Sequence, residues 1–459
     1  MSSERDLWNP RIELTPPNEM RELQFEKLKK QLRRVYTESP YYRQKFRDAK
    51  VDPYNLSSWE QFGDYPFFDK EEERISQEES KAKMKHPFGM HITCDPKKVV
   101  RVSSTSGTTG KPTFTGYTQK DREAANEVGA RLMWRIGARP GDVVMHGFVL
   151  SMWIAGVPVV DLLQNLGACT VPIGALTGAK RFAQIAREVF PVQLNCTPSY
   201  AEYLIKKLPE EAGVNAGDLG IQRILVSGEP GGSIPEVRQR LSRGFGGAKI
   251  YDAIGSTHAV FVSAVSCDAN AGMHFLADDY CLFELVDLDT LETVPFEDGA
   301  EGEIVLTGLE KECAPAIRWR DKDIVQVFTE PCVCGRPGFR FVVKGRADDM
   351  LLVRGVNVYP YAIKDVVTGF HSKVTGNIKI VLNEPPPVAR PPLPVRVELR
   401  ETLPPETAQH LAKDIEDKIH HSLRFRAAVE LVDFGTLESK MGNTHKSQLI
   451  LKAYESNEG

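Results

Sequence analysis

The stretch SSTSGTTGKPT occupies residues 103–113 and combines hydroxyls, two glycines and one lysine. Glycine lets backbone N–H groups approach phosphate oxygens, the hydroxyls add hydrogen-bond donors, and Lys111 adds a compact positive charge. The stretch is not a Walker A loop, because only two residues separate Gly107 from Gly110 and because Pro112 prevents a helix from following the lysine. It predicts a phosphate-binding loop, and the alternative is an ordinary Ser/Thr/Gly surface loop.

Outside this stretch, the pattern of apolar residues predicts the architecture. Between about residues 99 and 340, short apolar runs alternate with helical stretches. This alternation is typical of βα units and a largely parallel sheet, and the run at 99–104 is expected to be one of its strands. Residues 281–328 instead contain apolar runs separated by turn residues, which predicts antiparallel strands. We therefore expect a fold of the α/β class.

The chain is too long for a single hydrophobic core. Its 459 residues exceed the roughly 250–300 residues that one core reaches. We predict a large N-terminal domain of βα sheets at 1–347, which includes a small β-rich subdomain at about 265–340, and a small α+β C-terminal domain at 348–459. The sequence also predicts a helix over residues 19–48 and a solvated, charged helix or loop over residues 69–85 without a functional role.

Charge and composition restrict the partners. The chain has 58 basic and 62 acidic side chains, so it lacks the basic excess typical of nucleic-acid or anionic membrane binding. Residues 143–160 are long enough to cross a bilayer, but His146 and Pro158 favour a buried strand, a turn and a helix start. Sparse cysteines, with no signal-peptide pattern in the first ten residues, predict a cytoplasmic protein.

Further motifs follow the loop along the chain. They are Ser227-Gly228-Glu229-Pro230, Ile254-Gly255-Ser256-Thr257-His258, Arg318-Trp319-Arg320-Asp321-Lys322-Asp323, and the segment from Gly345 to Pro360. With the loop, they resemble the signature motifs of the adenylate-forming enzymes, which include the acyl- and aryl-CoA ligases. SPYYRQKF near the N-terminus, PFG at 87–89 and the short C-terminal region resemble the phenylacetate–CoA ligase branch of that family. The resemblance extends over nearly the whole chain.

The resemblance implies a reaction with two steps. ATP activates an aromatic carboxylic acid (aryl or arylacetic) to an acyl-adenylate with the help of Mg²⁺, and coenzyme A then displaces AMP to form a thioester. The small C-terminal domain is expected to move between the two steps. Alternative acceptors are a carrier-protein thiol or an amine, and a different alternative is a non-catalytic nucleotide- or acyl-binding homologue. A homodimer is expected from base rates.

The resemblance also assigns nucleotide-binding and coenzyme A-binding residues. Asp323 is expected to hold the ribose hydroxyls, Arg346 to reach ribose or phosphate, and Gly355 to let a pantetheine arm pass close to the backbone. The alternatives are a solvated aspartate, an arginine paired with Asp348 or Asp349, and a turn glycine. The other expected nucleotide-binding residues are Ser104, Thr105, Ser106, Gly107, Thr108, Thr109, Gly110, Lys111, Ser227, Gly228, Glu229, Pro230, Asp252, Ala253, Ile254, Gly255 and Ser256.

An aromatic slot is the expected acid pocket. Ligands of open α/β sheets bind beyond the carboxyl ends of the strands, and an aromatic lining suits a planar acid. The alternative for each residue taken singly is core packing. The expected pocket residues are Phe148, Met152, Trp153, Tyr200, Ile254 and Gly255.

His258 departs from the family pattern. The family carries Tyr-Gly-x-Thr-Glu at this point, and its glutamate helps to hold Mg²⁺. Neutral imidazole is a poor ligand for a hard cation that prefers oxygen. We therefore predict that His258, which follows the catalytic candidate Thr257, binds a phosphate or the substrate carboxylate.

A second departure lies near the C-terminus. The family lysine that binds the carboxylate and the α-phosphate is replaced by Asn443. Lys440 and Lys446 are the candidates to supply the missing charge. The loss of one charged donor typically lowers the rate by about 10²–10³.

Cysteine spacing predicts a metal site. Cys-Val-Cys at 332–334 and a cysteine and histidine separated by six residues give a Cys₃His set, which is typical of structural zinc. The phenylacetate branch has similar segments. The alternatives are unligated cysteines with a surface histidine, or replacement of a ligand by Cys281 or Cys313. The predicted zinc ligands are Cys267, His274, Cys332 and Cys334.

Overall fold

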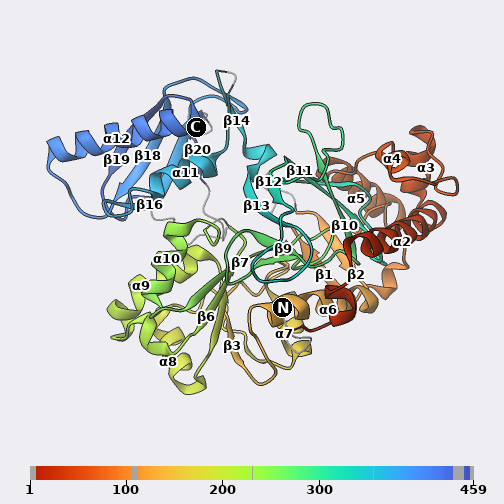
Figure 1. The fold of residues 1–459 in the computed structure, drawn as a ribbon, viewed down its shortest axis with the longest axis horizontal. Helices are drawn as coiled ribbons and strands as arrows, with labels where there is room; N and C mark the ends of the chain where they lie inside the picture. The colour runs from red at the N-terminus through yellow and green to blue at the C-terminus, as the bar shows by residue number, and fades with distance from the viewer. Residues whose placement is uncertain (1–6, 106–111, 230, 355, 438–448, 455–459) are drawn as a thin grey trace. The chain divides into compact units, whose positions relative to one another are not determined.

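The computed structural model describes residues 7–105, 112–229, 231–354, 356–437 and 449–454 (Figure 1). The chain divides into two compact units. The first comprises Met1–Gly228, Leu241–Asp321 and Gln326–Val342, and the second comprises Glu229–Arg240, Lys322–Val325 and Val343–Gly459. The predicted domain boundary between residues 347 and 348 stays a prediction.

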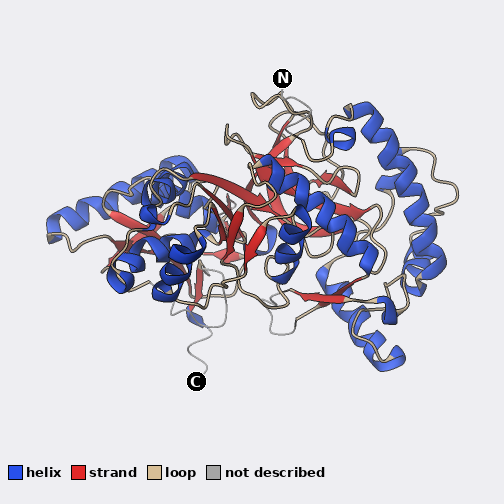
Figure 2. Ribbon diagram, turned by 90° about the horizontal axis from the view of Figure 1, so that it is seen from below, coloured by secondary structure: helices blue, strands red, loops and turns tan. Residues whose placement is uncertain are grey.

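Parallel strands form one half of the 11-stranded sheet found in the described residues. Helices connect successive strands, as a parallel pair requires, and Figure 2 shows helices (blue) beside the strands (red). The strands are β7 (Lys249–Ile254), β6 (Arg223–Ser227), β5 (Gln193–Cys196), β3 (Val143–His146) and β4 (Cys169–Val171) in spatial order. The connecting helices are α7 (Val157–Leu166), α8 (Ala179–Val189), α9 (Pro198–Ala212) and α10 (Pro235–Gly244). The predicted α/β class is confirmed.

Antiparallel strands form the other half of the same sheet. The predicted antiparallel pairing within residues 281–328 is correct for β10 and β11. The hydrogen-bonded order continues from β7 through β8 and β9 into β13, so the strands of the predicted β-rich subdomain extend the parallel half. These strands are β8 (Ala264–Ser266), β9 (Met273–Phe275), β10 (Cys281–Val286), β11 (Glu301–Gly308), β12 (Trp319–Phe328) and β13 (Arg340–Arg346).

The run at 99–104 does not join the parallel sheet, contrary to expectation. Its residues form β1 (Arg101–Ser104), which pairs only with the antiparallel β2 (Phe114–Tyr117) in a two-stranded sheet of the described residues. Ser104 is opposite Phe114 in this pair. The predicted phosphate loop therefore connects two strands of a hairpin, whereas a Walker A loop connects a strand to a helix.

Helix α5 (Lys70–Met84) has a buried face made of polar residues. Sequence analysis predicted a solvated segment here, but Glu73, Ser76, Gln77 and Ser80 recur at helical spacing and are buried. Gln77 hydrogen-bonds both backbone groups of Phe114, at 2.8 Å to its oxygen and 3.0 Å to its nitrogen. The polar face of α5 thereby fixes the position of β2.

The predicted helix over residues 19–48 is two helices. They are α2 (Pro17–Glu38) and α3 (Pro40–Asp48), and Ser39 caps the second one by accepting from the backbone of Tyr42. Proline is tolerated in the first turn of a helix, so Pro40 starts α3. The other described helices are α1 (Pro10–Glu13), α4 (Trp59–Gly63) and α6 (Gln119–Arg135), with 3₁₀ turns at Pro96–Lys98, Ala216–Leu219 and Ala347–Asp349.

The described part of the second unit contains two small sheets, and helices pack against the larger one. Buried and half-buried residues alternate along β16, as expected for a strand with one covered face, and apolar residues of α11 and α12 belong to the same core. One sheet has the order β15 (Val356–Val358), β14 (Leu351–Val353), β17 (Val388–Ala389). The other has β19 (Ala427–Val432), β18 (Leu393–Leu399), β16 (Val374–Leu382), β20 (Ile450–Lys452), with α11 (Pro360–Thr368) and α12 (Pro405–Leu423).

The apolar stretch at 143–160 forms β3, a turn and the start of α7, as predicted. None of the described helices is both long and apolar enough to span a membrane.

Gln77→Ala is expected to lower the free energy of unfolding by about 1–3 kcal/mol, because both backbone groups of Phe114 lose their partner. Urea unfolding of the purified protein measures this loss. Glu78→Ala on the exposed face of the same helix is the matched control and is expected to change stability by less than about 0.5 kcal/mol. Equal effects of the two substitutions would contradict the proposed anchoring.

Candidate active site

Aromatic residues gather beyond the carboxyl end of β3. Phe148 is buried, and its ring meets Trp153 edge to face at 5.4 Å between centroids. Gly228 follows β6 with a φ of +87°, and a Cβ on it would lie 2.8 Å from the Trp153 ring. Glycine is therefore required for the close approach of this indole to the backbone. The structure thus brings three predicted site residues together.

Tyr200, on α9, lies at the same end of the sheet. Its ring would be 3.0 Å from a Cβ at Gly147, the residue directly before Phe148. Burial raises the pKa of its phenol, and its hydroxyl makes no hydrogen bond within the described part of the chain. A buried, unpartnered hydroxyl points to a polar group on whatever binds here.

The segment carrying Met152 connects this aromatic cluster to the predicted phosphate loop. The backbone N–H of Ser104 donates to the carbonyl of Met152 at 2.9 Å, while the Met152 side chain is 49 % exposed. Thr105 closes the base of the loop, since its N–H donates to the carbonyl of Thr113 at 3.2 Å and their hydroxyls lie 2.9 Å apart. Both backbone donors are therefore occupied, and the hydroxyls are the groups that these two residues offer a ligand.

Gly255 directly follows β7, whose last residue is Ile254. A Cβ at Gly255 would lie 1.8 Å from the carbonyl oxygen of Phe261, so no other residue fits at this position. The close approach lets the following segment, Ser256 to His258, turn back along the end of the sheet. Asp252 and Ala253, also predicted site residues, are buried inside β7.

His258 is paired with a residue that sequence analysis did not select. Its Nε2 lies 3.0 Å from Oε1 of Glu73 on α5, and its ring stacks on Trp319 at 3.5 Å with an interplanar angle of 18°. Both members of the pair are buried. An ionised carboxylate only accepts hydrogen bonds, so Nε2 carries the proton in this pair.

The backbone beside His258 is held by a buried lysine. Lys311 is fully buried, and its Nζ donates to the carbonyls of Thr257 at 3.0 Å and His258 at 3.1 Å. Burial lowers the pKa of this ammonium, although Asp121 acts in the opposite direction. Tyr117 of β2 adds a second donor to the Thr257 carbonyl at 2.6 Å. The predicted catalytic residues thus sit on a rigid backbone.

Ser256 extends this network to the start of β12. Its hydroxyl donates to Asp321 at 2.9 Å, and the indole N–H of Trp319 donates to the same carboxylate oxygen at 2.9 Å. This contact orients the indole on which His258 stacks. Trp319 belongs to a motif noted in the sequence, but its role as a platform was not predicted.

Asp323 and Arg346 lie together in the second unit. Arg346 Nη1 contacts Asp323 at 2.9 Å, and Nε and Nη2 bind Asp348 at 2.8 and 2.9 Å. The alternative predicted for Arg346, a salt bridge with Asp348, is therefore present. The same guanidinium also orients the aspartate that was expected to hold the ribose.

Several predicted residues add little to the geometry of the site. Ser227 ends β6, and Glu229 belongs to the second unit although it follows Gly228 directly in the chain. The predicted residues outside the described ranges are Ser106, Gly107, Thr108, Thr109, Gly110, Lys111, Pro230, Gly355, Lys440 and Lys446.

The four predicted metal ligands converge. Their ligand atoms all lie within 4.8 Å of one another. Cys267 Sγ is 3.7 Å from Cys332 Sγ, and Cys334 Sγ is 3.5 Å from His274 Nε2. Burial lowers the pKa of His274, which favours the neutral ring that a metal needs. Cys281 and Cys313, the alternative ligands, are outside this cluster.

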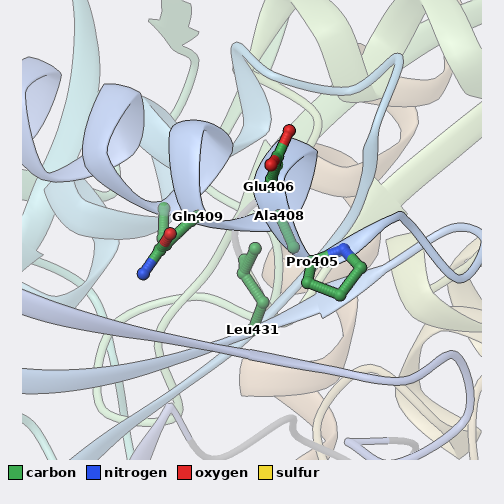
Figure 3. Close-up of a pocket in the computed structure, with 6 residues that line it drawn as sticks. Pro405, Glu406, Ala408, Gln409 and Leu431 are labelled. Atoms are coloured by element: carbon green, nitrogen blue, oxygen red, sulfur yellow. The ribbon is translucent and has the colours of Figure 1, made fainter.

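A surface pocket on the second unit contains none of the predicted site residues (Figure 3). It lies between the first turns of α12 and Leu431 of β19, and apart from one carboxylate and one amide its lining is apolar. Its lining residues are Pro405, Glu406, Ala408, Gln409, Ala412 and Leu431. It lacks the convergent polar groups that surround Thr257 and His258.

Glu73 and Lys311 were missed for a physical reason. Both are charged residues in charged or mixed stretches, where a solvated position is the usual outcome. The signal for Glu73 is the polar stripe at positions 73, 76, 77 and 80, which has the spacing of one helix face. No comparable pattern marks Lys311.

Comparison with known proteins agrees with this arrangement. Residues 49–310 match the AMP-binding enzyme family, and residues 355–450 match the AMP-binding enzyme C-terminal domain. The chain is 31 % identical to a phenylacetate–coenzyme A ligase of Thermus thermophilus over 434 residues, covering 93 % of each chain. It is 27 % identical to that of Escherichia coli, covering 94 % of this chain and 95 % of the relative.

A solved structure is similar over nearly the full length. It is 2-hydroxyisobutyryl-CoA ligase in complex with 2-HIB-AMP, with a TM-score of 0.88, 28 % identity, and coverage of 99 % of this chain and 94 % of that one. The predicted reaction is thereby confirmed: ATP-dependent activation of a carboxylic acid to an acyl-adenylate, then thioester formation with coenzyme A. The chain belongs to the AMP-binding, adenylate-forming enzymes, in their phenylacetate–coenzyme A ligase branch.

Proposed function

We propose that this AMP-forming acid–thiol ligase activates an aromatic carboxylic acid. The observation that carries the proposal is the aromatic wall beyond β3 and β6, where Phe148 meets Trp153 and Trp153 covers Gly228. A flat ring gains both burial and edge-to-face contacts from such a wall. The relatives named phenylacetate–coenzyme A ligase support this choice, whereas the similar solved structure names an aliphatic hydroxy acid, so both classes belong in the test.

The unpartnered hydroxyl of Tyr200 supports a substituted ring. A buried hydroxyl without a partner costs roughly 1–3 kcal/mol, which a hydrogen-bonding group on the substrate offsets. Hydroxy- or amino-substituted aryl acids are therefore the preferred substrates within the proposed class.

The loop at residues 104–111 is proposed to bind the triphosphate. The approaching carboxylate and the phosphates repel each other, and Lys111 and the hydroxyls of Ser104 and Thr105 offset that repulsion. In the second unit, Asp323 accepts hydrogen bonds from the ribose hydroxyls, and Arg346 keeps its carboxylate in place. The hydroxyls of Thr105 and Thr113, which flank the loop, lie 2.9 Å apart.

Position 258 does not fit Mg²⁺. An imidazole has no oxygen to offer a hard cation, and this one is already hydrogen-bonded to Glu73 through Nε2 and stacked on Trp319. Mg²⁺ bound to ATP supplies charge neutralisation in this family, and we assign no step to protein-bound metal at this residue. His258 and Thr257 are instead proposed to contact the phosphate or the carboxylate, and Lys440 or Lys446 to add the charge that Asn443 lacks.

Thioester formation requires a second arrangement of the site, because coenzyme A enters after pyrophosphate has left. A domain boundary at residues 347/348, with a mobile C-terminal domain at 348–459, provides this change, and Gly355 is proposed to border the pantetheine arm. Transfer to a carrier protein, a homodimer and a cytoplasmic location stay predictions.

Pyrophosphate release is expected when the enzyme is mixed with ATP and an aryl acid, and a thioester is expected only after coenzyme A is added. The panel includes benzoate, phenylacetate, their hydroxy and amino derivatives, and 2-hydroxyisobutyrate. Lys440→Ala and Lys446→Ala are assayed in parallel. The variant that lacks the functional lysine is expected to release pyrophosphate about 10²–10³ times more slowly. Turnover of the aliphatic acid alone would contradict the aromatic assignment.

Gly228→Ala is expected to raise KM for the aryl acid roughly tenfold, because the new methyl group displaces Trp153. Initial rates at varied acid concentration measure it. Gly137→Ala is the matched control, since Gly137 has a similar φ of +92° and a methyl group added there would meet nothing within 4 Å. A KM change shared by both variants would show that backbone strain, not the indole, causes the effect.

We also propose a structural zinc ion between Cys267, His274, Cys332 and Cys334. Tetrahedral Zn–S and Zn–N bonds of about 2.3 and 2.0–2.1 Å place two sulfurs about 3.8 Å apart and a sulfur and nitrogen about 3.5 Å apart. The observed separations of 3.7 and 3.5 Å fit that geometry. Four protein ligands leave no open position, so the ion stabilises the fold and takes no part in the reaction.

Elemental analysis of the purified enzyme is expected to find about one zinc per chain. Cys332→Ser combined with Cys334→Ser removes two ligands, so the zinc content and the melting temperature are both expected to fall. Cys169→Ser is the control, because Cys169 is exposed and does not belong to the four-ligand cluster. Full zinc content in the double variant would rule out this ligand set.

A further inference from the structure

The Glu73–His258 pair joins two segments that are 185 residues apart in the sequence. Glu73 comes from the polar face of α5, the same face that fixes β2 through Gln77. His258 comes from the segment after β7. A carboxylate that is 1 % exposed is costly to bury unless a cation or strong donors meet it.

The balance of forces on Glu73 favours its ionised form. Burial raises the pKa of this carboxyl. The charge and hydrogen bond of His258, with smaller contributions from His91 and Thr113, outweigh burial and hold the pKa below its usual value. The neighbouring His91 is a weaker candidate for the counter-charge, because burial lowers its pKa to about 4. Lys311 already serves two backbone carbonyls.

Contacts with several described residues fix the ring of His258 and the backbone beside it. Glu73 holds Nε2, Trp319 covers one face, and Lys311 and Tyr117 fix the carbonyls of the adjoining backbone. The hydrogen bonds of His258 within the described ranges use its Nε2, its backbone N–H and its carbonyl, and none uses Nδ1. It is therefore the ring atom that remains for a ligand.

We propose that Glu73 is a positioning residue for adenylation, which orients His258 and supplies its counter-charge so that Nδ1 presents a charge-assisted donor to a phosphate or carboxylate oxygen. This inference rests on the proposed role of His258 and extends it to a residue outside every family motif noted above. The pair forms and breaks no covalent bond. It places a donor for an anion at position 258, where the family pattern has a carboxylate.

Kinetics of ATP–pyrophosphate exchange test the proposal through a double-mutant cycle. Glu73→Gln keeps the size of the side chain and removes its charge. It is expected to lower kcat roughly 10–100-fold and to raise KM for ATP by a smaller factor, about threefold. His258→Gln is expected to lower kcat by about the same factor. In the His258→Gln background, Glu73→Gln is expected to lower kcat by less than about threefold, because the imidazole through which Glu73 acts is absent.

Glu78→Gln on the exposed face of α5 is the matched control and is expected to leave kcat unchanged. If Glu73 acted only in folding, the kcat losses of the two single variants would multiply in the double variant. That outcome overturns the proposal. So does a Glu73→Gln enzyme as active as the control. If Glu73→Gln does not fold, Glu73→Asp, which keeps the charge but shortens the side chain, enters the cycle in its place.

Calorimetric binding of ATP to the same four proteins separates this inference from the proposed reaction. Should the wild-type enzyme release no pyrophosphate with any acid, the proposed substrate class fails, but the cycle is still measurable as ATP affinity. Weaker ATP binding in Glu73→Gln that disappears in the His258→Gln background supports the pair. Independent, additive effects on affinity count against it.

Discussion

The buried polar face of α5 is the constraint on which the site depends. A helix usually buries an apolar stripe, and its packing is then set by shape alone. Here Gln77 and Ser76 direct hydrogen bonds to named backbone and imidazole groups, and Glu73 directs a charge to His258. Directional contacts specify position more narrowly than apolar ones, because each misplacement leaves a buried polar group unpaired.

This constraint connects the two halves of the proposed nucleotide site. The strands β1 and β2 flank the proposed phosphate loop, and the segment after β7 carries Thr257 and His258. Both contact α5, and Tyr117 of β2 also donates directly to Thr257. Their relative placement therefore follows from one helix and one tyrosine, and a preorganised arrangement of this kind is what electrostatic catalysis requires.

The sequence was sufficient for the α/β class, the family and the convergence of the metal ligands, because these depend on local periodicity and on residue types with few alternative uses. It was insufficient where a charged residue is buried. Glu73 lies in a run that patterning assigns to solvent, and only its tertiary partner explains its position. The strand at 101–104 was assigned to the wrong sheet, since an apolar run does not reveal its pairing partner.

The amide of Gln77 has a consequence for the behaviour of the chain in concentrated solution. In an antiparallel pair, the N–H and C=O of one residue point either both toward the partner strand or both away from it. Those of Phe114 are both taken by Gln77, so they face outward on an edge. An unpaired strand edge is a template for strand addition by another molecule. At Phe114 the side chain of Gln77 occupies that edge, and it thereby protects the hairpin from intermolecular β-aggregation.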